Sequence, residues 1–180
     1  MKQDLVMKWI RNSKNTCEMI FDTDILSIFG KIGKISLLKK IFQDSDVIIT
    51  FEVYNELLKA KDAGYDFVDS ILEQGFKVIQ LDPDLILEFE QNKDKLRNIH
   101  YGELASILLC KKLKMDFATN DKKAKRFCEE NKVFWYDIVD ILRLCFLKHI
   151  MDERELRDVI KDIEIRDRTY ISKKERIFGN

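Results

Sequence analysis

Short apolar runs rich in β-branched residues alternate with helical patterns along most of the chain, and this alternation constrains the fold more than any other feature. It predicts five strands, each followed by one or two helical segments. The strands are expected at 18–22, 47–50, 76–81, 117–119 and 133–136. The helices are expected at 24–30, 34–42, 52–60, 62–74, from Asp82-Pro83 onward, and at 101–114, 121–131 and 138–150. Because helical crossovers join parallel strands, we expect an α/β fold: a parallel sheet within three α/β/α layers.

The chain has 180 residues, which is long enough for one domain with a substantial core. Residues 1–17 precede the first expected strand and form an N-terminal extension. Residues 18–150 hold the alternating pattern and form the main domain. Residues 151–180 are charged and are expected to be a helical C-terminal extension. Its apolar stripe consists of Leu156, Val159, Ile160 and Ile163.

Charge and cysteine content exclude several classes of protein. The 32 basic and 32 acidic residues give a formal net charge of zero, so the overall charge does not indicate which class of molecule the protein binds. No apolar run approaches the roughly 18 residues of a membrane span, and the N-terminus lacks the apolar core of a secretory signal. The four cysteines are widely spaced without a CxxC pair, which favours a reducing cytoplasmic location and disfavours a zinc site.

Four acidic residues that are distant in sequence are predicted to meet at one edge of the sheet. Asp22 ends the first strand, Glu56 lies early in the helix after the second, and Asp121 almost directly follows the fourth. Glu103 begins the helix that runs down to the fourth strand. In parallel α/β sheets, ligands bind at the carboxyl ends of the strands, near the point where the strand order reverses.

Clustered carboxylates repel one another unless one binds a proton or a cation lies among them. Mg²⁺ and Mn²⁺ prefer oxygen ligands, and one or two such ions activate water and stabilise the oxygens of a phosphodiester under attack. His100 and His149 have no nucleophile signature beside them, and neither GxGxxG nor GxxxxGK[ST] occurs. The pattern therefore favours a Mg²⁺ or Mn²⁺ site.

Four segments, IFDTDILSIF, IITFEVYNELLKA, HYGELASILLCKKL and FATNDKKAKRFCEENKV, resemble the PIN-domain nucleases, which include VapC-like toxins and RNA-processing enzymes. Together they span about residues 18 to 140. The resemblance implies that the metal-holding and catalytic acids are Asp22, Glu56, Glu103 and Asp121. It also implies an endoribonuclease that hydrolyses RNA phosphodiesters, either as a toxin with an antitoxin partner or as an RNA-processing enzyme. A homodimer is a further expectation; a membrane partner is not.

Residues beside the four acids are candidates for supporting roles. Asp24 is interpreted first as the N-cap of the following helix, with a role near the metal as the alternative. Outer positions around the metal are assigned to Thr23, Asp24, Thr119 and Asn120. Contacts to the RNA backbone are assigned to Lys122, Lys123, Lys125 and Arg126, with a solvated helix face as the alternative.

Two other functions remain open at this point. Asp22-Thr23-Asp24 after an apolar strand resembles the opening of haloacid-dehalogenase-type phosphatases, in which the first Asp is a nucleophile and the second an acid/base. That interpretation leaves Glu56 and Glu103 unused. The other alternative is a catalytically inactive PIN-like module that binds RNA or serves as a scaffold.

Overall fold

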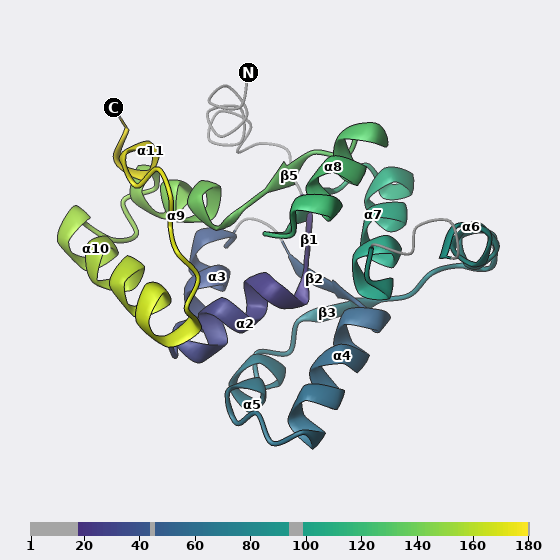
Figure 1. The fold of residues 1–180 in the computed structure, drawn as a ribbon, viewed down its shortest axis with the longest axis horizontal. Coiled ribbons are helices and arrows are strands. Elements are labelled where there is room, and N and C mark those ends of the chain that lie inside the picture. The colour runs from purple at the N-terminus through teal and green to yellow at the C-terminus, as the bar shows by residue number, and fades with distance from the viewer. Residues whose placement is uncertain (1–17, 44–45, 94–98, 180) are drawn as a thin grey trace.

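The computed structural model describes residues 18–43, 46–93 and 99–179, with the side chains of residues 92 and 93 excepted. Five parallel strands form one sheet in the order β3-β2-β1-β4-β5 (Figure 1). The strands are β1 (Met19–Phe21), β2 (Val47–Thr50), β3 (Lys77–Ile79), β4 (Asp116–Ala118) and β5 (Trp135–Tyr136). Because the chain passes from β1 to β2 and β3 and then returns to the other side of β1, the strand order reverses between β1 and β4. The expected α/β/α fold is confirmed.

Alternating residues of the strands face two separate apolar cores. Met19 and Phe21 of β1 pack on one side, and Ile20 packs on the other together with Ile48 of β2. Successive side chains of a strand point to opposite faces, so a strand buried on both sides is apolar throughout. This explains why the runs that form β1 and β2 show no polar alternation in the sequence.

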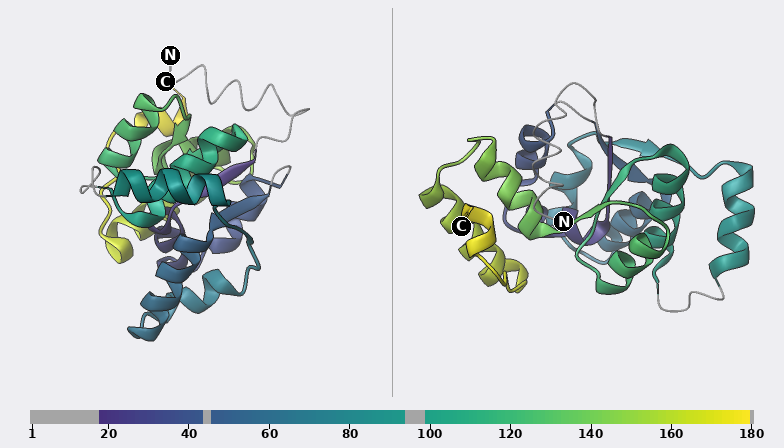
Figure 2. Two further views of the ribbon diagram at one scale, coloured as in Figure 1. Left: turned by 90° about the vertical axis from the view of Figure 1, so that its right-hand side faces the viewer. Right: turned by 90° about the horizontal axis from the view of Figure 1, so that it is seen from above.

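Helices cover both faces of the sheet. The core on one face is completed by side chains from α2 (Thr23–Lys31), α3 (Ile35–Ile41), α4 (Phe51–Asp62), α5 (Phe67–Leu72) and α9 (Ile138–Leu147). The core on the other face is completed from α6 (Pro83–Lys93), α7 (Tyr101–Leu113) and α8 (Lys122–Glu130). Figure 2 shows α6 standing at one end of the molecule, apart from the C-terminal helices at the other.

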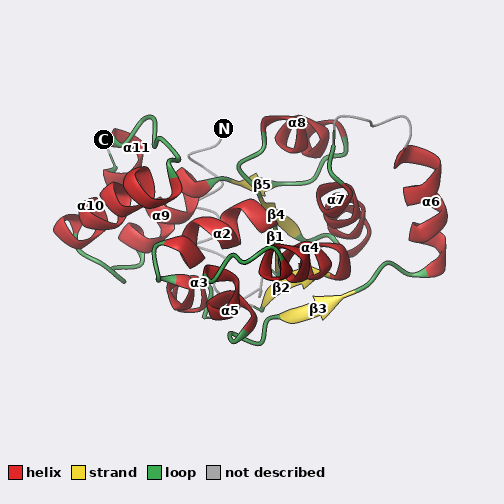
Figure 3. Ribbon diagram, turned by 60° about the horizontal axis from the view of Figure 1, so that its bottom comes forward, coloured by secondary structure: helices red, strands yellow, loops and turns green. Residues whose placement is uncertain are grey.

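The C-terminal residues pack into the same core as the first helices. They form α10 (Glu153–Asp162), a π-helical turn η1 (Ile163–Asp167) and α11 (Glu175–Phe178). The expected apolar stripe is confirmed, because its four members are buried. Contacts from η1 reach α2, and α11 lies against α9. Figure 3 shows this group of helices beside α2 and α9. The division at residue 150 stays a prediction, and segment 1–17 lies outside the described residues.

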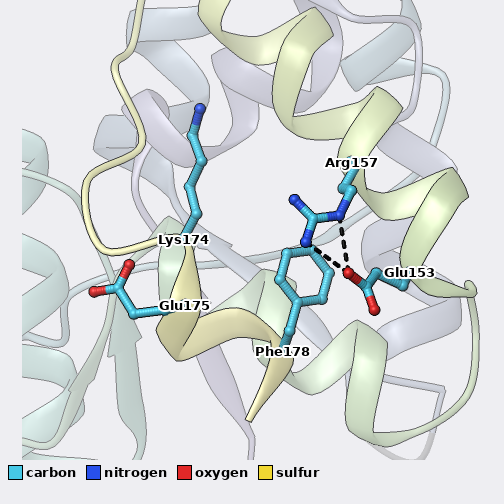
Figure 4. A pocket seen from close by; sticks show the side chains of 5 residues that line it. All are labelled: Glu153, Arg157, Lys174, Glu175 and Phe178. Atoms are coloured by element: carbon cyan, nitrogen blue, oxygen red, sulfur yellow. Dashed lines mark hydrogen bonds and ion pairs between the residues drawn. The ribbon is translucent and has the colours of Figure 1, made fainter. Parts of the chain in front are cut away.

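A hollow, that is, a surface cavity of about 380 Å³, lies between α10 and α11 (Figure 4). Its Arg157 donates to Glu153 Oε1 from Nη2 at 2.6 Å and stacks over the Phe178 ring, 4.6 Å from the centroid. Lys174 pairs with Glu164 at 2.7 Å. The cations of the hollow therefore already have partners inside the C-terminal segment, and these contacts join its helices.

The helix expected at residues 62–74 differs most from the structure. The segment 62–74 does not form a single helix: α4 ends at Asp62, and α5 begins only at Phe67. Gly64 lies between them with φ +88°. This left-handed conformation, which suits glycine, turns the chain between the two helices. None of the described helices is both long and apolar enough to cross a membrane.

Candidate functional site

Asp22 lies directly at the point where the strand order reverses. Its backbone N–H donates to the Ala118 carbonyl of β4 at 2.9 Å. Its carboxylate accepts from Thr23 N at 2.8 Å through Oδ1 and from the Thr119 hydroxyl at 2.7 Å through Oδ2. Asp22 is 4% exposed. The ends of β1 and β4 are thus joined through one buried carboxylate.

Asp22, and not Asp24, is the N-cap of α2, so the expectation that Asp24 caps this helix was wrong. The helix begins at Thr23, one residue earlier than predicted, because the backbone leaves β1 in an extended conformation at Asp22 and turns at once. Asp24 therefore lies inside the first turn. Its Oδ2 accepts from Asn120 N at 2.8 Å, whereas its Oδ1 is buried with no hydrogen-bond partner among the described residues.

Glu103 and Asp121 each commit one oxygen to a helix N-terminus. Glu103 Oε2 accepts from His100 N at 3.0 Å at the start of α7. Asp121 is the N-cap of α8, and its Oδ1 accepts from the N–H groups of Lys123 and Ala124. Within the described part of the chain, the second oxygen of each carboxylate accepts no protein hydrogen bond, so it is available to a cation.

Glu56 occupies a different position from the other acids. Its Oε2 accepts from the Thr23 hydroxyl at 2.6 Å, and its Oε1 accepts from Gly102 N at 3.3 Å. A Cβ on Gly102 would lie 2.7 Å from Glu56 Oε1, so only glycine permits this approach without displacement. Glu56 therefore links the residue after Asp22 to the residue before Glu103.

The pKa values show which carboxylates act on one another. Burial raises the pKa of Asp22 well above its usual value, and the charges of Asp24 and Glu103 raise it further. Burial raises the pKa of Asp24 to about 6, with a smaller contribution from Asp121. Burial also raises the pKa of Glu103 to about 7, and Asp121 and Asp24 add to that shift. Asp22, Asp24 and Glu103 thus share one electrostatic environment that disfavours their charged forms.

The carboxylate oxygens at this edge of the sheet are suitable ligands for a divalent cation. Their side chains, however, are not arranged around a common metal site. Carboxylate oxygens are the ligands preferred by Mg²⁺ and Mn²⁺, and the buried Asp24 Oδ1 accepts no hydrogen bond from the described residues. Among the described residues, however, no three His, Cys, Asp or Glu side chains are positioned to hold a metal ion. One oxygen each of Asp22, Glu103 and Asp121 instead accepts hydrogen bonds from the N-terminus of a helix.

Two residues near the site were not assigned a role from the sequence. Ser106 donates to the Gly102 carbonyl at 2.7 Å, one turn further along α7, and lies 3.5 Å from the Thr50 hydroxyl. Cys128 is fully buried, and burial raises its pKa to about 12, with contributions from the charges of Asp22 and Glu103. It is therefore an uncharged thiol beside the carboxylates and not a nucleophile. No spacing pattern in the sequence points to either residue.

Acidic residues at the reversal of the strand order occupy the place where α/β folds bind their ligands. The chain matches the family described as a PIN domain over residues 18–176. The chain belongs to the PIN-domain family, and the resemblance seen in its sequence is confirmed. Domains of this family are generally nucleases and typically bind divalent metal ions. A search of curated proteins returned no match.

Proposed function

We propose that this protein is a Mg²⁺- or Mn²⁺-dependent endoribonuclease that hydrolyses RNA phosphodiesters. The observation that carries the proposal is the convergence of buried carboxylates at the reversal of the strand order. Their raised pKa values and the orphaned Asp24 oxygen describe a site whose negative charge is not fully compensated. A divalent cation would supply the compensating charge, whereas a purely structural cluster of this kind only costs stability.

Asp22, Glu103 and Asp121 would hold the ion, and the buried Asp24 oxygen would be a further ligand on the same edge. Glu56, the fourth expected ligand, has a hydrogen bond to each carboxylate oxygen, as Asp22 has, and each oxygen keeps a lone pair that would be open to the ion. A bound divalent ion would activate water and neutralise charge on the phosphodiester. Thr119 orients Asp22, and Asn120 fixes Asp24 through its backbone N–H.

The choice of RNA as substrate comes from the family and from the shape of the target. Single-stranded or looped RNA presents a backbone that can enter an open protein edge. The exposed basic residues Lys122, Lys123 and Arg126 of α8 follow Asp121 and supply a surface for phosphates. The cellular role would be that of a toxin with an antitoxin, or of an RNA-processing enzyme, in the cytoplasm. A homodimer belongs to the same proposal.

The test is cleavage of end-labelled RNA by the purified protein with and without Mn²⁺, beside Asp22→Asn and Asp121→Asn. Both positions are helix N-caps, and Asn is as good a cap as Asp, so the variants should fold. We expect Mn²⁺-dependent cleavage that leaves 5′-phosphate ends and falls by on the order of 10² or more in both variants. Equal cleavage by wild type and variants would reveal a contaminating nuclease and overturn the proposal.

The same preparations distinguish the two alternative functions. Turnover of a phosphate monoester without RNA cleavage would identify a phosphatase that uses Asp22 and Asp24. Mobility-shift binding of RNA without cleavage, by well-folded wild type with Mn²⁺ present, would identify an inactive binding module. Both results contradict the proposed endoribonuclease.

A further inference from the structure

Lys125 differs from the other basic residues that follow Asp121. Its side chain is 18% exposed, whereas Lys122, Lys123 and Arg126 are exposed on the outer side of α8. A charged group is half-buried only when something compensates for its lost hydration. The basic cluster of the sequence therefore contains two kinds of residue: three solvated cations and one held against the body of the protein.

Two contacts hold the Lys125 ammonium in place. Its Nζ lies 3.2 Å from Asp137 Oδ2, and that carboxylate is itself 15% exposed. Nζ also lies 4.9 Å from the centroid of the Trp135 ring, a cation–π contact. Asp137 is fixed in turn as the N-cap of α9, through the Asp140 N–H at 3.1 Å. The ammonium is thus positioned by β5 and α9, two elements that do not carry it.

The fixed ammonium lies beside the carboxylate edge. Lys125 N donates to the Asp121 carbonyl at 3.0 Å, one turn into α8. Ile138, which follows Asp137, donates its N–H to Asn120 Oδ1 at 3.1 Å, and Asn120 N donates to Asp24. Burial raises the pKa of Asp24 to about 6, and the charge of Lys125 is among the influences that oppose this rise. Lys125 and the residue next to its ion-pair partner are therefore hydrogen-bonded to the segment that carries Asn120 and Asp121, and Asn120 is bonded to Asp24.

We infer that Lys125 is the fixed cation that holds a non-bridging oxygen of the scissile phosphodiester beside the carboxylate site. An ammonium has three N–H donors, and the Asp137 carboxylate leaves donors available for a phosphate oxygen. Because the ammonium is already positioned, it needs no reorganisation when charge develops on the phosphate. This inference rests on the proposed phosphodiesterase function and assigns Lys125 a role distinct from that of the surface lysines.

Lys125→Met tests the inference through two measurements, the cleavage rate and the Mn²⁺ affinity, which should not fall together. The single-turnover cleavage rate at saturating Mn²⁺ should fall by on the order of 10², because a charge-stabilising donor is lost. Mn²⁺ affinity, measured by calorimetry, should stay equal or rise by roughly threefold, because a positive charge beside the ion is removed. If Lys125 had only a structural role, its removal would disturb the site and lower both the cleavage rate and the Mn²⁺ affinity.

Three companion variants sharpen the result. Lys125→Arg should restore most of the cleavage rate, since it keeps the cation. Asp137→Asn keeps the α9 cap but weakens the hold on Lys125, so its cleavage rate should lie between wild type and Lys125→Met. Lys161→Met removes an exposed lysine of α10, remote in the sequence from the site elements, and should leave both measurements unchanged. Lys125→Gln replaces Lys125→Met if the latter fails to fold.

The outcomes separate this inference from the function on which it rests. Mn²⁺-dependent cleavage by wild type that is unchanged in Lys125→Met overturns the role of Lys125 alone. A parallel fall in Mn²⁺ affinity and cleavage rate does the same. Absence of metal-dependent cleavage in wild type overturns both proposals at once.

Discussion

Glu56 and Gly102 lie so close together that a residue with a side chain at position 102 would collide with Glu56. Gly102→Ala would place a Cβ 2.7 Å from Glu56 Oε1 and 3.1 Å from its Cδ, so the carboxylate must move away from Thr23. The moving group is the end of a flexible side chain, so unfolding free energy should fall by about 1 kcal/mol at most. RNA cleavage should fall by on the order of tenfold, because the site is misaligned.

Gly30→Ala is the matched control for this prediction. Its Cβ would lie 2.9 Å from Ile71 Cδ1 in the core at the far end of α2. We expect a loss of about 1–3 kcal/mol in unfolding free energy from overpacking, with cleavage unchanged below the melting transition. Urea unfolding and cleavage assays on both variants make the comparison. Equal effects of the two substitutions on cleavage would contradict the positioning role of Glu56.

The raised carboxyl pKa values make the metal-free protein sensitive to pH in a defined direction. The folded protein binds protons at Asp24 and Glu103 more tightly than the unfolded chain does, with pKa values of about 6 and about 7. Stability from these groups is therefore present near pH 4 and is lost as pH rises to about 7. Mn²⁺ should restore it most strongly above pH 7, where the carboxylates are charged.

Thermal unfolding of wild type and Asp24→Asn between pH 4 and 8, in a chelator, measures this effect. The Asn side chain carries no charge, so the variant should gain roughly 1–3 kcal/mol over wild type as the pH rises through 6. Added Mn²⁺ should then reduce the difference. A difference that stays constant across this range would show that Asp24 does not carry an unfavourable buried charge.

An ion pair that is largely buried links helix α11 to helix α9. Arg176 Nη2 lies 3.1 Å from Asp140 Oδ1, and Asp140 is 3% exposed. Arg176→Ala would remove this cation from a buried carboxylate, so we expect a loss of about 2–3 kcal/mol in the free energy of unfolding. Arg126→Ala breaks an exposed pair with Glu130 and should cost less than about 1 kcal/mol. Similar losses of unfolding free energy in both variants, measured by urea unfolding, would contradict a stabilising role of the Arg176–Asp140 ion pair.

The helix boundaries show where sequence patterns stop being informative. The order of strands and helices follows from alternating apolar runs, whereas the first residue of a helix depends on where the backbone turns. Asp22 and Asp24 are both suitable caps, and no residue pattern decides between them. Asp22 caps the helix because it is fixed to β4 through Ala118 and Thr119, a contact that spans almost a hundred residues.

At the scale of the whole molecule, topology explains how the carboxylates meet. The parallel order could be predicted from the pattern of strands and helices, and with it the edge at which Asp22 and Asp121 lie. The pattern could not predict that Glu56 would contact Thr23 and Gly102, because those contacts depend on the packing of α4 against α7. The surface against which the C-terminal apolar stripe packs could not be predicted either, since an amphipathic helix does not specify the surface that it covers.

Calorimetric titration of Mn²⁺ into the chelator-treated protein near pH 7.5 tests most directly whether this edge is a metal site. Asp22→Asn and Glu103→Gln serve as site variants, and Glu153→Gln, on the exposed face of α10, serves as the control. The account predicts saturable binding by wild type and by the control, with affinity reduced by at least about tenfold in both site variants. Absence of binding in folded wild type, or equal affinity in all four proteins, would contradict it.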